Sequence, residues 1–227
     1  AVCTAQPLTG PPAEPEYKYS TPIPPGVYSP DKVETRLGTL KFFDGFPDNA
    51  TAEKLWDNLD FQRAVQSFLL GMPAVSQVAN RHAFLTLGPS NTVLPIYEEL
   101  TDSRSIILTG NDNTVYSWVW LDLSEGPIVL EVPPKVLGTA NDMWQRWVVD
   151  VGITGPDKGK GGKYLFLPPG YKGSVPEQGY YSVPSPTYGL WVPWRSFLVD
   201  GDPKPGVDLV KKFTKIYPLA DAEKPHP

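Results

Sequence analysis

The sequence predicts a mainly β fold with accessory helices, an antiparallel sandwich or barrel within residues 31–200. Two observations support this prediction. From residue 106 onward, apolar residues alternate with polar ones or form short runs, which is typical of β-strands. Turns rich in glycine, proline, asparagine and aspartate separate these runs. Helical spacing occurs mainly before this region and again near the C-terminus.

The first 30 residues of the chain are not expected to form a hydrophobic core. Proline makes up 27 of the 227 residues, and many of these prolines lie between residues 7 and 30, interspersed with tyrosines. Polyproline-like backbone stays solvated, so residues 1–30 are expected to form an extended arm. Such an arm either docks as a tail on its own domain or reaches a neighbouring subunit. Cys3 is the only cysteine, so the chain cannot form an internal disulfide.

Charge and hydropathy exclude two classes of partner. The net charge is -5, and no segment concentrates the lysine and arginine that phosphate neutralisation needs, so nucleic acid is not an expected partner. No apolar run approaches the roughly 20 residues of a membrane span, so a soluble chain without a transmembrane segment is expected. The first residue is Ala1 rather than methionine, which indicates removal of a targeting peptide or a tag.

Residues 33–42 alternate in polarity and predict one strand, and helix follows within residues 51–82. An apolar stripe at helical spacing is expected to face the core, and it consists of Phe61, Val65, Phe68, Leu69 and Met72. Proline lacks an amide hydrogen and clashes with the preceding turn, so Pro73 predicts a bent amphipathic helix or two segments.

The later segments supply the strands of the domain. In residues 115–121 one face is expected to carry Tyr116, Trp118 and Trp120, with smaller residues on the other face. Further strands are predicted at residues 128–132, 147–153, 164–167 and 190–199. Residues 205–217 resemble a short helix and residues 220–227 a linker, so 203–227 is expected to form a short helix and a C-terminal tail.

A set of segments carries a resemblance to a known family. They are Phe61-Gln62-Arg63-Ala64-Val65, Asn113-Thr114-Val115-Tyr116, Trp120-Leu121-Asp122-Leu123-Ser124 with Gly126-Pro127, and Gly155-Pro156-Asp157-Lys158-Gly159-Lys160-Gly161-Gly162-Lys163-Tyr164 followed by Leu167-Pro168-Pro169-Gly170-Tyr171. Over roughly residues 31–200 the chain resembles the bacterial domain of unknown function 1254. The resemblance implies a jelly-roll-like β-sandwich with helices packed against it, and it implies no agreed activity.

The same resemblance bears on partners and location. Members usually continue into a second β-sandwich, the domain of unknown function 1214, and many carry export signals. This chain ends at Pro227, where that domain would begin, so it is expected to be a single-domain member or the N-terminal half of a longer protein. The partner is then a second β-sandwich domain or another copy of the chain. A periplasmic or secreted location in a bacterium is expected, with the cytoplasm left open.

Several polar residues are candidates for catalysis. Asp112, Asp122 and Asp150 would form a carboxylate cleft with Arg195 if the strands converge. Solvated outer faces are the alternative for the aspartates, and an internal salt bridge is the alternative for the arginine. His82 is the only histidine outside the tail, and it serves either a pocket or the local structure.

Metal and cofactor chemistry has one candidate site. Asn111, Asp112 and Asn113 offer the oxygen ligands that calcium or magnesium prefers, while an ordinary β-turn explains the same residues. No multi-histidine or paired-cysteine spacing predicts a zinc or iron site. No cofactor is therefore expected beyond a divalent cation.

The aromatic residues give the other candidate site. Tyr116, Trp118, Trp120, Trp191 and Trp194 are expected either to pack the core or to form a stacking platform for a carbohydrate or a small apolar ligand. Two hypotheses follow. The first is a binding or assembly module for a small ligand or partner, and the second is an enzyme or enzyme half whose cleft a second domain completes.

Overall fold

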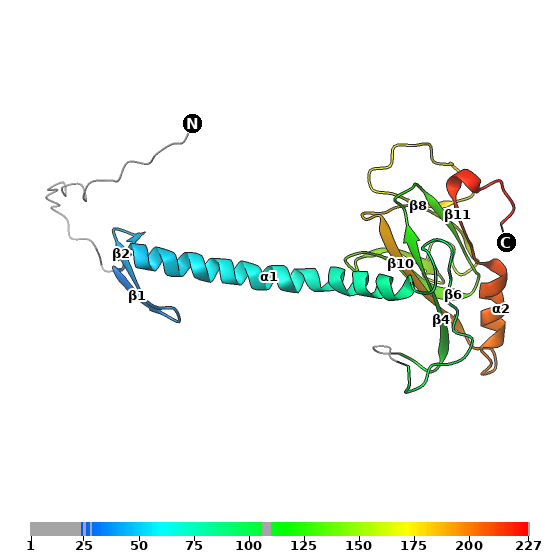
Figure 1. Ribbon diagram of the computed structural model, residues 1–227, viewed down its shortest axis with the longest axis horizontal. Helices are drawn as coiled ribbons and strands as arrows, with labels where there is room; N and C mark the ends of the chain where they lie inside the picture. Colours follow the sequence, from blue (N-terminus) through cyan, green and yellow to red (C-terminus); the bar gives the residue numbers. More distant parts are fainter. Residues whose placement is uncertain (1–23, 25, 28, 106–109, 227) are drawn as a thin grey trace. The chain divides into compact units, whose positions relative to one another are not determined.

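The computed structural model describes residue 24 and residues 26–27, 29–105 and 110–226 (Figure 1). The proline-rich arm predicted at residues 1–30 lies almost entirely outside the described residues. The chain divides between Gln66 and Ser67 into two compact units.

The first unit contains a three-stranded sheet in the order β1-β2-β3. Its strands are β1 (Lys32–Thr35), β2 (Gly38–Phe43) and β3 (Phe46–Pro47). The prediction of one strand over residues 33–42 is wrong, because the chain reverses at residues 36–37 and pairs β1 with β2 as an antiparallel hairpin. Gly38 follows this turn with a φ of +89°, which is favourable for glycine alone.

Helix α1 (Asn49–Phe84) begins in the first unit and ends in the second. Asp48 caps it by accepting a hydrogen bond from the backbone N–H of Thr51 at 2.8 Å. Hydrogen bonds from Thr51 lower the pKa of Asp48, which keeps this capping carboxylate charged. The helix continues through Pro73, so of the two predicted alternatives, one helix or two segments, the structure has one helix. Proline removes one amide from the ladder, and the exposure of the preceding turns lets water hydrate the carbonyl left without its donor.

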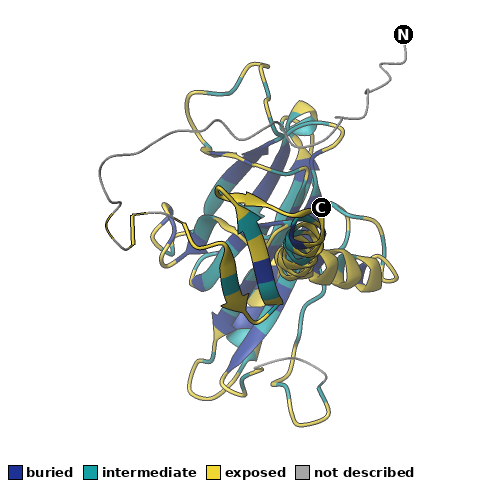
Figure 2. Cartoon of the chain, turned by 90° about the vertical axis from the view of Figure 1, so that its left-hand side faces the viewer, coloured by how far each residue is buried: buried dark blue, intermediate teal, exposed yellow. Residues whose placement is uncertain are grey.

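The apolar stripe of α1 is not part of the core. Phe61 is 69% exposed and Phe68 is 72% exposed, and the other stripe residues are exposed as well. Figure 2 shows α1 as exposed over most of its length. The prediction of a core-facing stripe is therefore wrong for the described residues, because the sandwich fills its core with side chains from its own strands.

The last turns of α1 are instead anchored in the second unit. Gln77 and Phe84 are buried, and the guanidinium of Arg81 lies 2.6 Å from the carboxylate of Asp122. This ion pair ties the helix end to the end of strand β4 (Thr114–Asp122). None of the described helices is long and apolar enough to cross a membrane.

The second unit is a sandwich of two four-stranded sheets, in the orders β4-β10-β6-β7 and β11-β5-β8-β9. The remaining strands are β5 (Ile128–Val132), β6 (Val136–Asp142), β7 (Trp147–Gly152), β8 (Gly162–Leu167), β9 (Tyr181–Pro184), β10 (Gly189–Phe197) and β11 (Lys215–Pro218). All pairs are antiparallel except β8 with β9. The prediction of a mainly β, antiparallel fold with accessory helices is confirmed.

The core lies between these sheets. Residues that alternate along β4 and β10, among them Val119, Leu121, Leu190 and Val192, meet Ile128, Leu130, Tyr164 and Phe166 from the second sheet. Because strand side chains alternate, the residues between these core positions point to the outer face of the β4-β10-β6-β7 sheet. That outer face carries the candidate site.

The C-terminal segment supplies a helix that contacts both sheets, the edge strand of the second sheet and a tail packed on that sheet. Helix α2 (Lys204–Phe213) lies where a short helix was predicted, but the prediction over residues 205–217 is wrong at its end, because Lys215–Pro218 form strand β11, which pairs with β5. The residues after β11 include a 3₁₀ turn, η1 (Leu219–Asp221), and they lie against Val129, Leu165 and Tyr217. The ring of His226 stacks on that of Tyr217, with centroids 3.7 Å apart.

Candidate functional site

The register of two neighbouring strands builds an aromatic surface. Strand β10 pairs with β4 so that Arg195 lies opposite Tyr116, Pro193 opposite Trp118 and Trp191 opposite Trp120. All six side chains belong to the outward-facing set of their strands, because their neighbours in sequence fill the core.

The next two strands add polar groups to the same face. On β6, Leu137 lies opposite Arg195 and Asn141 lies opposite Trp191. On β7, Asp150 lies opposite Thr139 of β6. The aromatic side chains of this face therefore come from β4 and β10, whereas Asn141 and Asp150 come from β6 and β7.

Together these residues enclose a cleft of about 500 Å³, here called the aromatic cleft. Its lining consists of Gly110, Tyr116, Trp118, Leu137, Gly138, Thr139, Asn141, Asp150, Thr154, Trp191, Pro193, Trp194 and Arg195. This volume lies in the range of small-molecule sites, roughly 300–1,000 Å³.

The predicted stacking residues divide between the cleft and the core. Tyr116, Trp118 and Trp191 are half-buried and line the cleft. Trp120 is fully buried and stacks on Trp191, with ring centroids 6.4 Å apart and planes at 25°. Trp194 borders the cleft, but its side chain belongs to the core.

The segment before β4 supports the aromatic wall from the side. The backbone N–H of Asn91 donates to the carbonyl of Trp120 at 3.1 Å, and that of Tyr97 donates to the carbonyl of Tyr116 at 2.9 Å. The ring of Tyr97 lies 5.3 Å from that of Trp118, in a tilted arrangement. Trp118 is thus held between a packed neighbour and the cleft.

Asp150 is the carboxylate of the cleft. The indole N–H of Trp147 donates to its Oδ1 at 2.8 Å, which orients the carboxylate. Among the described residues, Asp150 makes no ion pair within 4.0 Å, so Oδ2 remains available to a hydroxyl donor.

Arg195 supplies the positive charge of the cleft. Its guanidinium lies 5.5 Å from the ring centroid of Tyr116, a cation–π contact. Within the described part of the chain no carboxylate pairs with it, so the internal salt bridge considered from the sequence is not present there.

The other candidate catalytic residues lie elsewhere. Asp122 pairs with Arg81, Asp112 is exposed in the turn before β4, and His82 is exposed on α1. Burial by itself would raise the pKa of Asp122, but hydrogen bonds from Ser124 and the charge of Arg81 outweigh it and lower that pKa. The structure brings only Asp150 and Arg195 of the predicted set to the aromatic cleft.

Asn111, Asp112 and Asn113 have the geometry of a turn. Oδ1 of Asn111 accepts hydrogen bonds from the backbone N–H groups of Asn113 and Thr114 at 3.2 and 3.1 Å. It also accepts the Thr114 hydroxyl at 2.9 Å, so this oxygen is engaged by the protein itself. In the described ranges no group of three or more histidine, cysteine, aspartate or glutamate side chains is placed to hold a metal ion.

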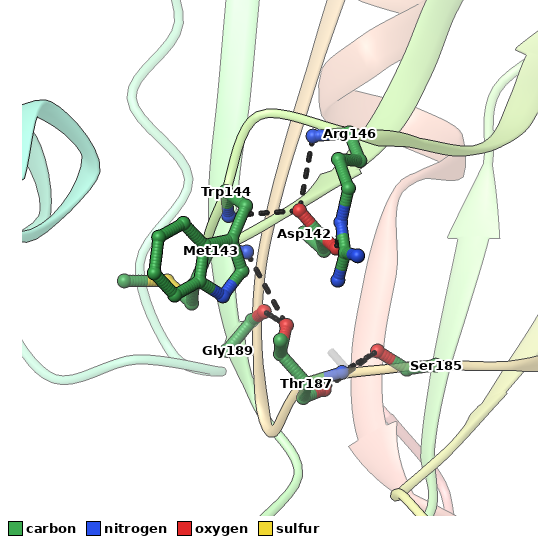
Figure 3. Close-up of polar contacts among 7 residues, drawn as sticks. All are labelled: Asp142, Met143, Trp144, Arg146, Ser185, Thr187 and Gly189. Carbon is green, nitrogen blue, oxygen red and sulfur yellow. Dashed lines mark hydrogen bonds and ion pairs between the residues drawn. The ribbon is translucent and has the colours of Figure 1, made fainter. Parts of the chain in front are cut away.

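A further carboxylate, Asp142, serves the turn between β6 and β7 (Figure 3). It is fully buried and accepts hydrogen bonds from the backbone N–H groups of Trp144 and Arg146 at 2.8 and 2.9 Å. Nε of Arg146 donates to its other oxygen at 2.7 Å. In the adjacent turn, the hydroxyl of Thr187 accepts from the N–H of Met143 and donates to the carbonyl of Gly189. Asp142 is therefore a structural carboxylate.

Sequence reasoning missed several polar and apolar residues of the cleft, chiefly Thr139, Asn141 and Thr154. The alternation along residues 136–142 indicates which of these side chains share a face. Their proximity to Trp191 depends on the pairing of β6 with β10, which are distant in the sequence.

The family model described as "Protein of unknown function (DUF1254)" matches residues 90–218. The crystal structure of the VPA0106 protein from Vibrio parahaemolyticus superposes with a TM-score of 0.55 and 17% sequence identity. This similarity covers 71% of the present chain and 39% of that protein, and at this identity it concerns the fold alone. Among curated protein sequences, none is similar enough to count as a match. Because the family model covers more than half of the chain, including the whole sandwich, the chain belongs to the DUF1254 family of proteins of unknown function.

Proposed function

We propose that the chain is a ligand-binding module whose aromatic cleft holds a small carbohydrate. The observation that carries this proposal is the convergence of half-buried aromatic rings with polar side chains on one sheet face. Tyr116, Trp118 and Trp191 contribute aromatic side chains to the lining, while Asn141 and Asp150 offer hydrogen-bonding groups a strand or two away.

A sugar ring matches this division of the surface. Its C–H face is apolar and stacks on an indole, whereas its hydroxyl groups project from the edge of the ring and need donors and acceptors. Oδ2 of Asp150 accepts no hydrogen bond from the described residues, since Trp147 donates to Oδ1, and the side-chain amide of Asn141 likewise makes none within them. Both side chains are therefore available to a ligand.

The alternative function, an enzyme or enzyme half with a carboxylate and arginine cleft, has less support. Acid–base chemistry by paired carboxylates needs two such groups facing one substrate. Among the described residues of the lining, Asp150 is the one carboxylate, since the other predicted aspartates lie outside the aromatic cleft. Binding needs no second carboxylate.

Calorimetric titration of the purified chain with a panel of neutral and acidic mono- and oligosaccharides tests the proposal. At least one sugar is expected to bind, and Trp118→Ala should weaken that binding by about ten-fold or more, since a stacked ring contributes roughly 1–3 kcal/mol with its buried area. The matched control is Trp144→Ala, because this tryptophan is 45% exposed and lies outside the cleft.

Thermal unfolding monitored by circular dichroism establishes that both variants are folded. If Trp118→Ala proves unstable, Trp118→Phe keeps a smaller ring and should weaken binding by a lesser factor. The proposal is overturned if no sugar of the panel binds, or if the Trp144→Ala control loses as much affinity as Trp118→Ala.

A further inference from the structure

We infer that the ligand of the aromatic cleft is an acidic sugar, a hexuronate, whose carboxylate binds Arg195. This inference rests on the proposed function and adds the chemical class of the sugar. Its basis is the positive charge of Arg195 in the cleft, which has no counterion among the described residues.

The guanidinium of Arg195 is held in place without being neutralised. Arg195 is half-buried on the central strand β10, and its described contact is the face of the Tyr116 ring, 5.5 Å away. No carboxylate among the described residues lies within 4.0 Å of it. A partly desolvated guanidinium is more stable with an anionic partner, and its planar fork fits a carboxylate through two parallel hydrogen bonds. The missing partner is therefore expected to come from the ligand.

The positions of the two charged groups orient such a ligand. Arg195 is on β10 and Asp150 is on β7, with β6 between them. These strands are two spacings apart, or about 10 Å. Asp150 repels a carboxylate and accepts hydrogen bonds from hydroxyl groups. The acidic end of the ligand is thus directed to Arg195 and the hydroxyl-bearing end to Asp150.

The groups between these ends suit a pyranose ring. Pro193 and Trp118 lie opposite each other beside Arg195, and they present apolar surface. Thr139 donates its hydroxyl to the carbonyl of Val149 at 3.3 Å, which leaves Asn141 as the uncommitted amide on β6. A hexuronate has its carboxylate at one end of the ring, hydroxyl groups at the other and an apolar face between them.

A single arginine also argues for a carboxylate over a more highly charged group. Sites for phosphate usually combine several donors, such as a helix N-terminus or a cluster of cationic side chains. Within the described residues, the lining of the aromatic cleft contains one cationic side chain, Arg195, and one carboxylate, Asp150. One singly charged planar anion matches the single guanidinium of Arg195.

The test compares uronates with the neutral sugars that differ only at C6. Glucuronate and galacturonate, as monomers and as trimers, are titrated against glucose and galactose of the same length by calorimetry. The parent chain is expected to bind the best uronate about ten-fold more tightly than its neutral counterpart, since a charge-assisted bidentate pair is among the strong hydrogen bonds. This preference should shrink at high salt, because the interaction involves charge.

Arg195→Gln should abolish the preference for the uronate, measured in that variant as the ratio of its affinities for the uronate and for the neutral counterpart. Arg195→Lys should restore part of the preference, because it keeps the charge and loses the fork. The control is Arg63→Gln on α1, which removes the same charge from an exposed position outside the cleft. It should bind both sugars as the parent does.

The outcomes separate the inference from the proposed function. If neutral sugars bind through Trp118 and uronates bind no better, the inference is wrong and the carbohydrate proposal stands. An unchanged uronate preference in Arg195→Gln also overturns it. If neither class binds, the proposed function fails and the inference fails with it.

Discussion

The hydroxyl of Tyr164 donates a hydrogen bond to Oδ1 of Asp157, and both side chains are buried where the β7–β8 loop meets the core of the sandwich. The same carboxylate accepts the backbone N–H groups of Gly152 at 2.9 Å and Gly161 at 3.0 Å. Asp157 thus ties both ends of a glycine-rich loop to the sheet. Burial first, and then the hydrogen bond and the negative charge of Asp157, raise the pKa of Tyr164 above its usual value.

This raised pKa predicts a loss of stability in alkali. An unfolded tyrosine ionises at a pH of about 10, whereas folded Tyr164 keeps its proton to a higher pH. The unfolded state therefore releases a proton first, and the stabilisation present below about pH 10 is lost progressively above it. Urea unfolding between pH 8 and pH 11 measures this loss, and Tyr164→Phe should make it smaller. Tyr188→Phe is the control, because that ring is exposed, and equal slopes in Tyr164→Phe and the parent would contradict the prediction.

Gly138 is expected to tolerate no side chain. A Cβ atom at this position would lie 2.5 Å from the carbonyl oxygen of Pro193 and 2.5 Å from Cβ of Trp194. Gly138→Ala should therefore force β6 away from β10 and destabilise the fold by about 2–3 kcal/mol. Gly71→Ala on α1 is the matched control, since a Cβ atom at that position would meet nothing within 4 Å. Alanine there should raise helix stability by up to about 1 kcal/mol, and a loss in both variants by urea unfolding would rule out the steric explanation.

The ion pair between Arg81 and Asp122 is expected to hold the end of α1. Asp122→Asn should lower the free energy of unfolding by about 1 kcal/mol, because the pair is partly exposed, and should speed amide hydrogen exchange in the last turns of the helix. The lowered pKa of Asp122 means that its contribution is present above a pH of about 4 and is lost as the pH falls through the folded pKa. Asp60→Asn serves as the control, because the exposed Asp60–Arg63 pair is 4.0 Å apart. Unchanged exchange in Asp122→Asn would show that other contacts anchor the helix.

Trp147 is expected to act on binding through Asp150. Its indole N–H orients Oδ1 of that carboxylate, yet Trp147 does not line the cleft. Trp147→Phe should weaken sugar binding by about three-fold, which is the loss of one modest hydrogen bond, and Asp150→Asn should weaken it more. Calorimetry with the best-binding sugar measures both effects. When Asp150→Asn is already present, adding Trp147→Phe should cause no further loss of affinity. Fully additive losses in the double variant would show that Trp147 acts independently of Asp150.

The residues that form helix α1 could be predicted from the sequence, but the exposure of its apolar stripe to solvent could not. Periodicity at residues 61–72 indicated a helix, and α1 does span those residues. The same pattern suggested burial, and the side chains are exposed. An apolar stripe shows that one face of a helix is apolar, whereas the partner of that face depends on which other elements reach it. The sandwich core was already filled by its strands.

The sequence indicated the residue types of the candidate site, but only some of the individual residues that line it. Alternation along residues 115–121 put Tyr116 and Trp118 on one face, and the structure agrees. The same alternation could not separate Trp120, which is buried under its neighbours, from Trp118, which lines the cleft. Asp112 and Asp122 carried the same chemical signal as Asp150, but Asp112 lies in the turn before β4 and Asp122 at its end, where it pairs with Arg81 outside the cleft.

By itself, the sequence determined the mainly β class, the strand faces and the family resemblance, because a period of two and the turn residues act over a few neighbouring positions. Only the tertiary structure decided that β10 lies between β4 and β6, and therefore that Arg195 and Trp191 meet Tyr116 and Asp150 in one cleft. Strand order and register arise from packing between residues far apart in the chain, and shifting β10 by one residue would turn Arg195 into the core and Trp194 toward the ligand.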